Sequence, residues 1–340
     1  MDALPPRIQG LVVTSEGDRT RMQLQEIPSE QLPPGDVVIR VAYSSINYKD
    51  ALATQGHPGI VKRLPHVPGI DAAGIVERSQ DARYRPGDQV IVTGYDLGQG
   101  RWGAWAELIS VPADWIVPLP SGLDLREAMI LGTAGFTAAQ CVLALQRNEV
   151  TPGDGRLVVT GATGGVGSLS VRILAQLGYE VAAVTGKAHL ADRLRSAGAV
   201  EILDREAVAD ASDRPMLSAR WAGGVDCVGG RPLMTLLRST KYGGAVAACG
   251  LVAGAELHMT VYPFLLRGVS LCGVASADCP YARRVKIWQL LAGEWKPRDL
   301  ADFWVTEIGL EQVPTYVDRM LQGKADGRII VRLPGAPAAS

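Results

Sequence analysis

The chain has 340 residues, more than one hydrophobic core usually serves, so we expect two domains. Lys and Arg number 34 and Asp and Glu 35, and this balance gives no electrostatic basis for binding nucleic acid or an anionic membrane. The five cysteines contain no C-x-x-C pair, which favours a reducing, cytoplasmic location. The N-terminus lacks the pattern of a signal peptide, and the longest weakly polar run, Tyr242–Ala255, is too short to span a bilayer.

The first third of the chain has the pattern of short strands separated by turns. Segments such as Pro33-Pro34-Gly35-Asp36 and Pro86-Gly87-Asp88 interrupt the apolar runs at close spacing, which is typical of a compact, partly barrel-like β domain. One short helix is predicted over Asn47–Thr54. The predicted strands are Ile8–Val13, Arg21–Ile27, Val37–Ser44, Ile70–Arg78, Gln89–Thr93, Leu108–Val111 and Trp115–Leu119.

From Asp124 onward the pattern changes, because helices and strands begin to alternate. A long apolar helix is predicted over Leu125–Arg147, and six strands in βα order then predict a doubly wound parallel sheet. The predicted strands are Leu157–Thr160, Val181–Thr185, Val200–Leu203, Gly224–Val228, Gly244–Cys249 and Val269–Val274. The predicted helices are the one from Val166 to Leu177 and those over Ala188–Ala197, Leu233–Ser239 and Tyr281–Trp295.

The end of the chain returns to the pattern of its beginning. A helix over Leu310–Leu321 is followed by a strand over Arg328–Leu333, which can rejoin the β domain and make it discontinuous. We therefore predict an α/β protein in which a Rossmann domain, residues 125–296, is inserted in a β domain made of residues 1–124 and 297–340.

The segment Arg156–Lys187 has the order strand, glycine turn, helix, strand that a dinucleotide fingerprint requires. Gly164 leaves the backbone open to a pyrophosphate, and Gly167 lets the helix pack close to the strand. The helix N-terminus offers N–H groups to phosphates. Ala162 stands where G-x-G-x-x-G has its first glycine, and a purely structural turn is the alternative interpretation. The expected cofactor contacts in this turn are Ala162, Thr163, Gly164, Gly165 and Val166.

The end of the second strand of this unit indicates which dinucleotide binds. NAD-preferring sites place Asp or Glu there to hold the ribose 2′-hydroxyl, and such a carboxylate would repel a 2′-phosphate. Here the strand ends in Thr185-Gly186-Lys187, and the next carboxylate is Asp192. Thr185, Lys187 and, farther on, Arg193 can bind a phosphate, so we predict NADPH. The alternative is that Lys187 is an ordinary surface lysine.

Several segments outside the glycine turn match one known group of proteins. They are Ser45–Leu52, Pro68–Asp71, Trp102–Gly103, Gly132–Ala138, Tyr242–Leu251, Pro263–Arg267 and Gly327–Arg328. With the β domain and the inserted nucleotide domain, they resemble the acrylyl-CoA reductase branch of the medium-chain dehydrogenase/reductase superfamily, a branch that also carries the name quinone oxidoreductase. The resemblance runs from about Gly10 to Leu333 and implies a GroES-like β domain.

The resemblance also has implications for metal binding and assembly. Zinc alcohol dehydrogenases of this superfamily hold the catalytic metal with a Cys and a Gly-His-Glu segment. Here Asn47 and Gly69-Ile70-Asp71 stand at those places, and no cluster of four cysteines exists for a structural zinc, so no metal is predicted. The family further suggests a homodimer formed by the strand Val269–Val274.

The segment that replaces the metal ligands supplies the candidate catalytic groups. By resemblance and position, Tyr48 is a proton donor or enolate partner, Asn47 a hydrogen-bond donor, and Asp50 a group that orients the cofactor. The alternative makes Tyr48 a core aromatic residue and Asp50 a surface charge. The remaining expected contacts to the cofactor or substrate are Thr137, Cys249, Gly250, Leu251 and Arg328.

The activity implied by the resemblance is NADPH-dependent reduction of acrylyl-CoA to propionyl-CoA. A quinone or α,β-unsaturated carbonyl reductase is the alternative, because both reactions use the same hydride donor. A non-catalytic nucleotide-binding sensor is a more distant alternative. Binding of CoA phosphates would need cations, and the candidates are Arg63, Arg83, Arg85, Arg283, Arg284 and Arg298.

Overall fold

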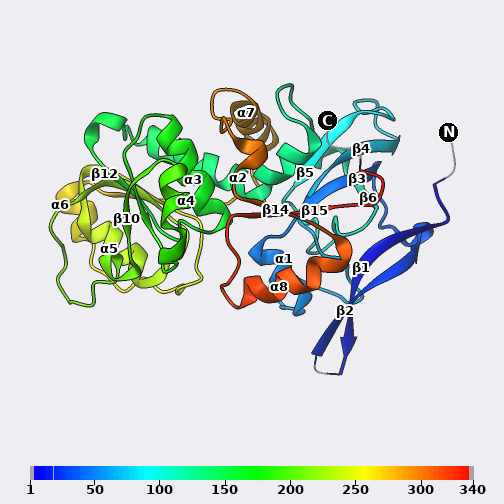
Figure 1. The fold of residues 1–340 in the computed structure, drawn as a ribbon, viewed down its shortest axis with the longest axis horizontal. Coiled ribbons are helices and arrows are strands. Elements are labelled where there is room, and N and C mark those ends of the chain that lie inside the picture. Colours follow the sequence, from blue (N-terminus) through cyan, green and yellow to red (C-terminus); the bar gives the residue numbers. More distant parts are fainter. Residues whose placement is uncertain (1–3, 18, 337–340) are drawn as a thin grey trace. The chain divides into compact units, whose positions relative to one another are not determined.

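A computed structural model describes residues 4–17 and 19–336, and the chain divides into two compact units (Figure 1). The first unit comprises Met1–Thr133, Ala277–Ala292 and Asp299–Ser340, and the second comprises Ala134–Ser276 and Gly293–Arg298. The start of the long helix and the helix over Tyr281–Ala292 therefore group with the first unit, whereas the predicted limits fell at residues 124 and 297.

The first unit is built on a seven-stranded sheet with the order β14-β15-β3-β4-β5-β7, in which β6 also pairs with β3. Strands β3, β4 and β5 are antiparallel to one another and bury a core of branched aliphatic side chains. Strand β14 was not predicted. The strands are β3 (Val37–Ser45), β4 (Asp71–Ser79), β5 (Gln89–Thr93), β6 (Leu108–Val111), β7 (Ile116–Pro118), β14 (Val305–Gly309) and β15 (Arg328–Arg332).

Besides the sheet and the start of the long helix, the described part of the first unit contains a hairpin and three further α-helices. Strands β1 (Arg7–Glu16) and β2 (Arg19–Pro28) pair along their full length as a separate two-stranded sheet. The predicted strands were shorter, because Ser15, Glu16 and Arg19 at their ends are polar and exposed. The helices are α1 (Tyr48–Thr54), α7 (Tyr281–Ala292) and α8 (Val313–Leu321).

The second unit is a six-stranded parallel sheet with the order β10-β9-β8-β11-β12-β13. The crossovers run outward from β8 in both directions, so right-handed connections place α3 (Gly165–Gln176) and α5 (Gly230–Ser239) on opposite faces. The predicted doubly wound sheet is thus confirmed. The strands are β8 (Leu157–Val159), β9 (Val181–Val184), β10 (Ala199–Leu203), β11 (Trp221–Asp226), β12 (Thr240–Ala248) and β13 (Ser270–Gly273).

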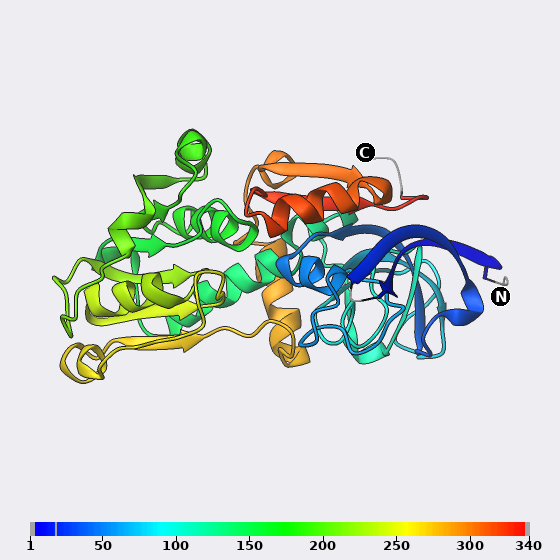
Figure 2. The ribbon, with the colours of Figure 1, turned by 90° about the horizontal axis from the view of Figure 1, so that it is seen from below.

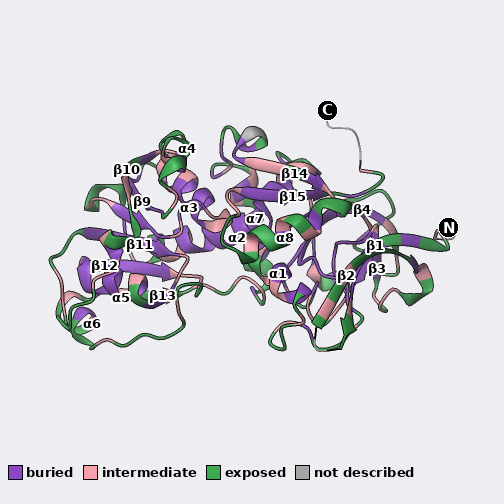
Figure 3. Cartoon of the chain, turned by 60° about the horizontal axis from the view of Figure 1, so that its bottom comes forward, coloured by how far each residue is buried: buried purple, intermediate pink, exposed green. Residues whose placement is uncertain are grey.

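Burial in the second unit follows from this topology. The central strands are covered on both faces, and Figure 3 shows β9 and β11 as buried along their length. Strand β13 instead lies at the end of the sheet beside β12 (Figure 2). Its residues alternate between half-buried and exposed. Two smaller helices, α4 (Ala191–Ser196) and the unpredicted α6 (Tyr262–Arg267), complete the unit.

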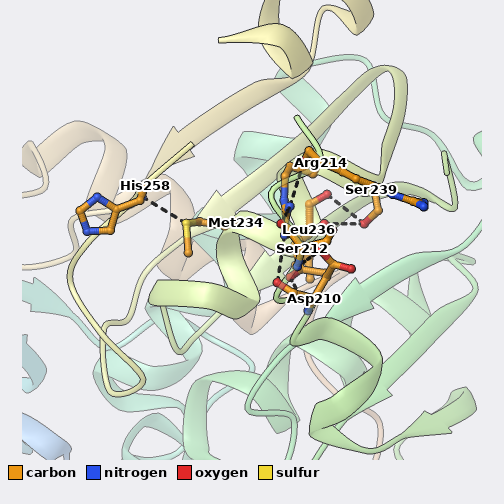
Figure 4. Close-up of polar contacts among 9 residues, drawn as sticks. Asp210, Ser212, Arg214, Met234, Leu236, Ser239 and His258 are labelled. Atoms are coloured by element: carbon orange, nitrogen blue, oxygen red, sulfur yellow. Dashed lines mark hydrogen bonds and ion pairs between the residues drawn. The ribbon is translucent and has the colours of Figure 1, made fainter. Parts of the chain in front are cut away.

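The long connection between β10 and β11 is held by one side chain of α5. Arg238 donates hydrogen bonds to the carbonyls of Asp210, Ser212 and Arg214 and to the Asp210 carboxylate, at 2.8 to 3.0 Å. Within the connection, Ser212 Oγ donates to Asp210 Oδ1 at 2.6 Å (Figure 4). A buried arginine thus satisfies the carbonyls of a segment that lacks regular structure.

Helix α2 (Leu125–Arg147) is interrupted at Gly132, where φ is 48° and ψ is −154°. The carbonyls of Met129 and Ile130, which the break leaves without helical partners, accept hydrogen bonds from Arg328 at 3.2 and 2.7 Å. On the other side of the break, the Thr133 N–H donates to Asp71 Oδ2 at 2.9 Å. The Arg328 cation thus caps the helix C-terminus that Gly132 creates, and the Asp71 carboxylate caps the new N-terminus.

By length and apolar composition alone, α2 is long enough to cross a membrane. However, 83% of its most apolar stretch is buried inside the protein, as expected of a core helix.

Replacing Gly132 by alanine should lower the free energy of unfolding by about 2 kcal/mol or more, because φ lies in the left-handed region and the new Cβ meets polar groups. That Cβ would lie 2.6 Å from Asp71 Oδ2 and 2.9 Å from Arg328 Nη2. Urea unfolding followed by circular dichroism measures the change. Gly153→Ala is the matched control, because its nearest neighbour, Thr151 Oγ1, is 3.9 Å away. Equal stability of the two variants would contradict the prediction.

Candidate active site

A buried polar network surrounds Asn47, the residue that precedes α1. The Asn47 side-chain amide donates to Ser45 Oγ at 3.1 Å and to Asp71 Oδ2 at 2.8 Å, and its carbonyl oxygen faces Arg328 Nη1 at 3.4 Å. The structure therefore brings Asn47, Asp71 and Arg328 together from three distant parts of the sequence. Two of these were predicted site residues, and the role of Asp71 as an acceptor for the others was missed.

Asp50 lies in the first turn of α1 and is completely buried. Its Oδ1 accepts the N–H groups of Gly69 and Ile70 at 3.1 and 2.8 Å, and its Oδ2 accepts the N–H of Asn47 at 2.8 Å. Burial raises the pKa of Asp50 to about 7, and the charge of Asp71 adds to the rise. Asp50 thus ties the metal-replacing segment at residues 69–71 to the start of α1.

Asp71 is the acceptor that joins these groups to the break in α2. Besides the amide of Asn47 and the N–H of Thr133, its carboxylate accepts the hydroxyls of Ser45 at 2.7 Å and of Thr133 at 2.6 Å. Arg328 is also buried, and burial lowers its pKa despite the nearby charges of Asp71 and Asp50. Its guanidinium donates to main-chain carbonyls of α2. Arg328 therefore holds the network together and is not a surface cation.

Tyr48 differs from its neighbours because its side chain is open to solvent. It is the first residue of α1 and is 45% exposed, whereas Lys49 is half-buried. The alternative that Tyr48 is a core aromatic residue is wrong, and Asp50 is not a surface charge.

The network does not have the donors that zinc requires. Asn47 offers N–H groups to two carboxylates, and Arg328 brings a cation to the same place. Zinc sites are built from deprotonated Cys, neutral His and carboxylates. In the part of the chain that the structure describes, no group of three or more His, Cys, Asp or Glu side chains is arranged to hold a metal ion.

The glycine turn of the second unit lies between β8 and α3. Gly164 is the N-cap of α3, and a Cβ there would meet only the Gly161 carbonyl, at 3.3 Å. A Cβ on Gly167 would overlap the backbone of Gly161 and Ala162, so this glycine is needed for close packing of the helix on the turn. Gly165 and Val166 are the first two residues of α3, where backbone N–H groups have no acceptor within the helix.

A cavity of about 400 Å³ opens beside this turn, at the carboxyl ends of the parallel strands. Thr163 and Thr185 line it and are joined by a hydrogen bond of 3.2 Å between their hydroxyls, and the Lys187 N–H donates to Thr185 Oγ1 at 3.0 Å. Crevices at this end of a doubly wound sheet are the usual place of a dinucleotide. The other lining residues are Thr160, Gly161, Val184, Gly186, Arg205, Val208, Ala209, Val228, Pro232, Val252 and Ala253.

Arg205 is the cation of this cavity, and the sequence interpretation missed it. Thr185 directly follows β9, and its N–H donates to the carbonyl of Leu203 at the end of β10, at 3.0 Å. Arg205 comes two residues after Leu203. A Cβ on Gly186 would overlap the Arg205 guanidinium, so the glycine makes room for that side chain. The sequence signal that could have identified Arg205 was its position just after β10, at the carboxyl end of the strand that pairs with β9.

The other predicted cofactor residues are placed less directly. Arg193 is exposed on α4 and Lys187 is half-buried, and neither lines the cavity. Thr137 is buried in α2. Cys249, Gly250 and Leu251 follow β12 at the carboxyl end of the sheet, directly before the lining residues Val252 and Ala253.

Two of the candidate arginines for CoA are engaged elsewhere. The prediction that Arg284 can bind CoA phosphates is wrong, because this side chain is fully buried. Its guanidinium donates to the carbonyls of Thr93 and Ala277 at 2.6 and 2.8 Å. Arg83 forms ion pairs with Asp81 and Asp114 at 2.8 and 2.7 Å. The candidates Arg63, Arg85, Arg283 and Arg298 are exposed.

Two stretches of the chain match known protein families in sequence. Residues 33–121 match the family described as "Alcohol dehydrogenase GroES-like domain", and residues 165–292 match the one described as "Zinc-binding dehydrogenase". A parallel dinucleotide-type sheet with a GroES-like β unit is the architecture of the medium-chain oxidoreductases. The chain belongs to the medium-chain dehydrogenase/reductase superfamily, in the branch of the acrylyl-CoA reductases, which confirms the predicted resemblance.

Individual relatives are similar along nearly the whole chain. Acrylyl-CoA reductase AcuI of Ruegeria pomeroyi is 47% identical over 93% of this chain and 96% of its own length. The Bacillus subtilis protein YhfP, named as a quinone oxidoreductase, is 46% identical over 96% and 98%. Its crystal structure with NAD bound has a TM-score of 0.93. The Salmonella enterica oxidoreductase yhdH in complex with NADP has a TM-score of 0.93 and 44% identity over 95% of this chain and 99% of that one.

The raised pKa of Asp50 predicts a particular pH dependence of stability. Between its ordinary pKa of 3.8 and its folded pKa of about 7, the folded state binds more protons than the unfolded state at this site. The contribution of Asp50 to the free energy of unfolding therefore falls by up to about 4 kcal/mol as the pH rises from 4 to 7. The measurement is the urea midpoint of the wild type minus that of Asp50→Asn, across this range. A difference that rises with pH would contradict the raised pKa.

Proposed function

We propose that this protein catalyses the NADPH-dependent reduction of the activated C=C bond of acrylyl-CoA, giving propionyl-CoA. The observation that carries the proposal is the 47% identity to an acrylyl-CoA reductase over 93% of the chain. The network around Asn47 supports it, because a hydrogen-bonded cluster stands where alcohol dehydrogenases of the superfamily hold zinc. Reduction of a C=C bond conjugated to a thioester needs no metal to polarise an alcohol.

The second unit fits NADPH in its shape and charge. The N–H groups at the start of α3 and the open side of Gly164 suit a pyrophosphate, and Arg205 beside Gly186 suits a 2′-phosphate. When bound, NADPH supplies the hydride. Relatives crystallised with NADP and NADPH support this assignment, and the relative crystallised with NAD makes the preference a quantity to measure.

The first unit is proposed to supply the groups that act on the substrate. Addition of hydride to the β carbon moves negative charge to the thioester oxygen, and a positioned donor there lowers the barrier. Tyr48 is the exposed phenol next to the network and serves as the proton donor or enolate partner. Asn47 and Asp50 hold the start of α1, so they position Tyr48 rather than move protons.

A quinone or α,β-unsaturated carbonyl reductase is the second candidate. The 46% identity to YhfP, a protein named as a quinone oxidoreductase, favours it. Both candidates use the same cofactor and the same proposed donor, so they differ in the substrates turned over.

We also propose a cytoplasmic homodimer. All five cysteines are free, as expected in a reducing compartment. In the residues that the structure describes, β13 pairs with β12 alone, and Leu271, Leu265 and Leu266 nearby are 37%, 75% and 59% exposed. An exposed edge strand with apolar neighbours is suited to pairing with its copy. Sedimentation of a monomer at micromolar concentration would exclude this assembly.

Arg205→Ala should lower kcat/KM for NADPH by about 10- to 100-fold and leave that for NADH almost unchanged, because one charge-assisted hydrogen bond to the 2′-phosphate is lost. Lys187→Ala should have a smaller effect, since Lys187 does not line the cavity. Arg193→Ala is the control on the neighbouring helix. Equal efficiencies of the wild type with NADPH and NADH would end the assignment of NADPH.

A turnover assay with NADPH tests the reaction itself. Acrylyl-CoA should be reduced with a higher kcat/KM than crotonyl-CoA, acrolein or a quinone, and a chelator should leave the rate unchanged because the network lacks zinc ligands.

Tyr48→Phe should lower kcat on acrylyl-CoA by about 100-fold or more, with little change in the Kd of NADPH.

The panel separates the candidates. Preference for a quinone would move the protein to the second candidate, and no turnover of any compound would leave a nucleotide-binding protein without catalysis. Unchanged turnover of Tyr48→Phe would remove the phenol from the reaction.

A further inference from the structure

Two cysteines lie side by side at the carboxyl end of the six-stranded sheet. Cys227 directly follows β11 and Cys249 directly follows β12, and these strands are paired in parallel register at Asp226 and Ala248. The Cys249 N–H continues this pairing by donating to the Asp226 carbonyl at 2.9 Å. Because the two cysteines occupy equivalent positions on neighbouring strands, their side chains leave the sheet on the same side.

The geometry of this pair is close to that of a disulfide. The two Sγ atoms are 3.8 Å apart. Equivalent residues of neighbouring strands have backbones about 4.8 Å apart, within the reach of a disulfide, whose S–S bond is about 2 Å. Rotation of the two side chains can therefore close the gap without a change in strand register.

The surroundings of Cys249 favour its thiolate. Hydrogen bonds from the thiols of Cys141 and Cys227 lower the pKa of Cys249, and the same bonds raise those of Cys141 and Cys227. Both Cys227 and Cys249 are partly exposed, whereas Cys141 is buried in α2. A partly exposed thiolate next to a second thiol is the arrangement of an oxidisable pair.

We propose that Cys227 and Cys249 form a reversible disulfide when the protein meets a peroxide. The Cys249 thiolate attacks one peroxide oxygen and breaks the O–O bond, which gives a sulfenic acid at Cys249 and, after proton uptake, one water. The Cys227 sulfur then attacks the Cys249 sulfur, its proton leaves with the hydroxyl group as a second water, and the S–S bond forms. Two thiols have lost two electrons, the peroxide has gained them, and a thiol reductant restores the pair.

Closing this disulfide would act on the glycine turn of the cofactor site, an expectation that rests on the proposed function. A Cβ on Gly161 would lie 3.4 Å from Cys227 Cβ, and the Cys227 N–H donates to Thr160 Oγ1 at 3.0 Å. A Cβ on Gly250 would overlap the Cys227 carbonyl, so the segment after Cys249 also packs on Cys227. Shortening the 3.8 Å distance between the two Sγ atoms to an S–S bond draws Cys227 and Cys249 together, and the segments packed on Cys227 next to the cavity shift with it. Oxidation should therefore weaken NADPH binding.

The test uses the full chain, reduced and then exposed to hydrogen peroxide without NADPH. Peptide mapping by mass spectrometry should find the Cys227 and Cys249 peptides joined, with two hydrogens lost, and free thiols should fall from the five of the reduced chain to three. Dithiothreitol should reverse both changes. The Kd of NADPH, from fluorescence titration, should rise about tenfold in the oxidised protein and return on reduction.

Cys227→Ser should abolish the cross-link, and Cys272→Ser is the matched control, since Cys272 is a half-buried cysteine on β13. A peroxide-treated wild type that carries a sulfinic acid, a Cys141–Cys249 bond or no modification would overturn the proposed pair. Formation of the disulfide with unchanged NADPH affinity would overturn its effect on the cofactor site. The mapping does not depend on turnover, so an inactive protein would leave its result valid.

Discussion

The break in helix α2 at Gly132 depends on two buried, oppositely charged side chains. Asp71 accepts the first N–H of the later segment, and Arg328 donates to the last carbonyls of the earlier one. Burying these charges costs hydration free energy, which is offset only if both ends stay fully hydrogen-bonded. The polar network around Asn47 exists because this exchange holds β4, β15 and α2 in one arrangement.

The same network joins several segments of the first unit without any metal ligand. In a zinc site, the cation collects side chains from several segments. Here the amide of Asn47 and the carboxylates of Asp50 and Asp71 perform that collecting role through N–H and O–H donors. Burying Asp50, and placing it close to Asp71, has an electrostatic cost, which is seen in the raised pKa of Asp50. A proton shared into this cluster near neutral pH relieves that cost.

Features encoded locally could be predicted from the sequence, and features made by distant segments could not. The glycine turn and α3 were predicted because the spacing of Gly164, Gly167 and the apolar residues is decided within one segment. Arg205 was missed because its nearness to Gly186 depends on the pairing of β9 with β10. Arg284 looked like a surface cation, since nothing in its helix indicates that it packs against Thr93. Strand β14 carries no alternating pattern and gains its structure from pairing with β15.

The discontinuity of the first unit has a consequence for the order in which the protein can fold during synthesis. Nearly all of the second unit is one continuous stretch, Ala134–Ser276, and can close its sheet as soon as that stretch is made. The earlier unit has to wait, because β15 pairs with β3 and carries Arg328. Until the ribosome has released β15, the carbonyls of Met129 and Ile130 lack their guanidinium partner. The half that starts first at the ribosome is thus completed last.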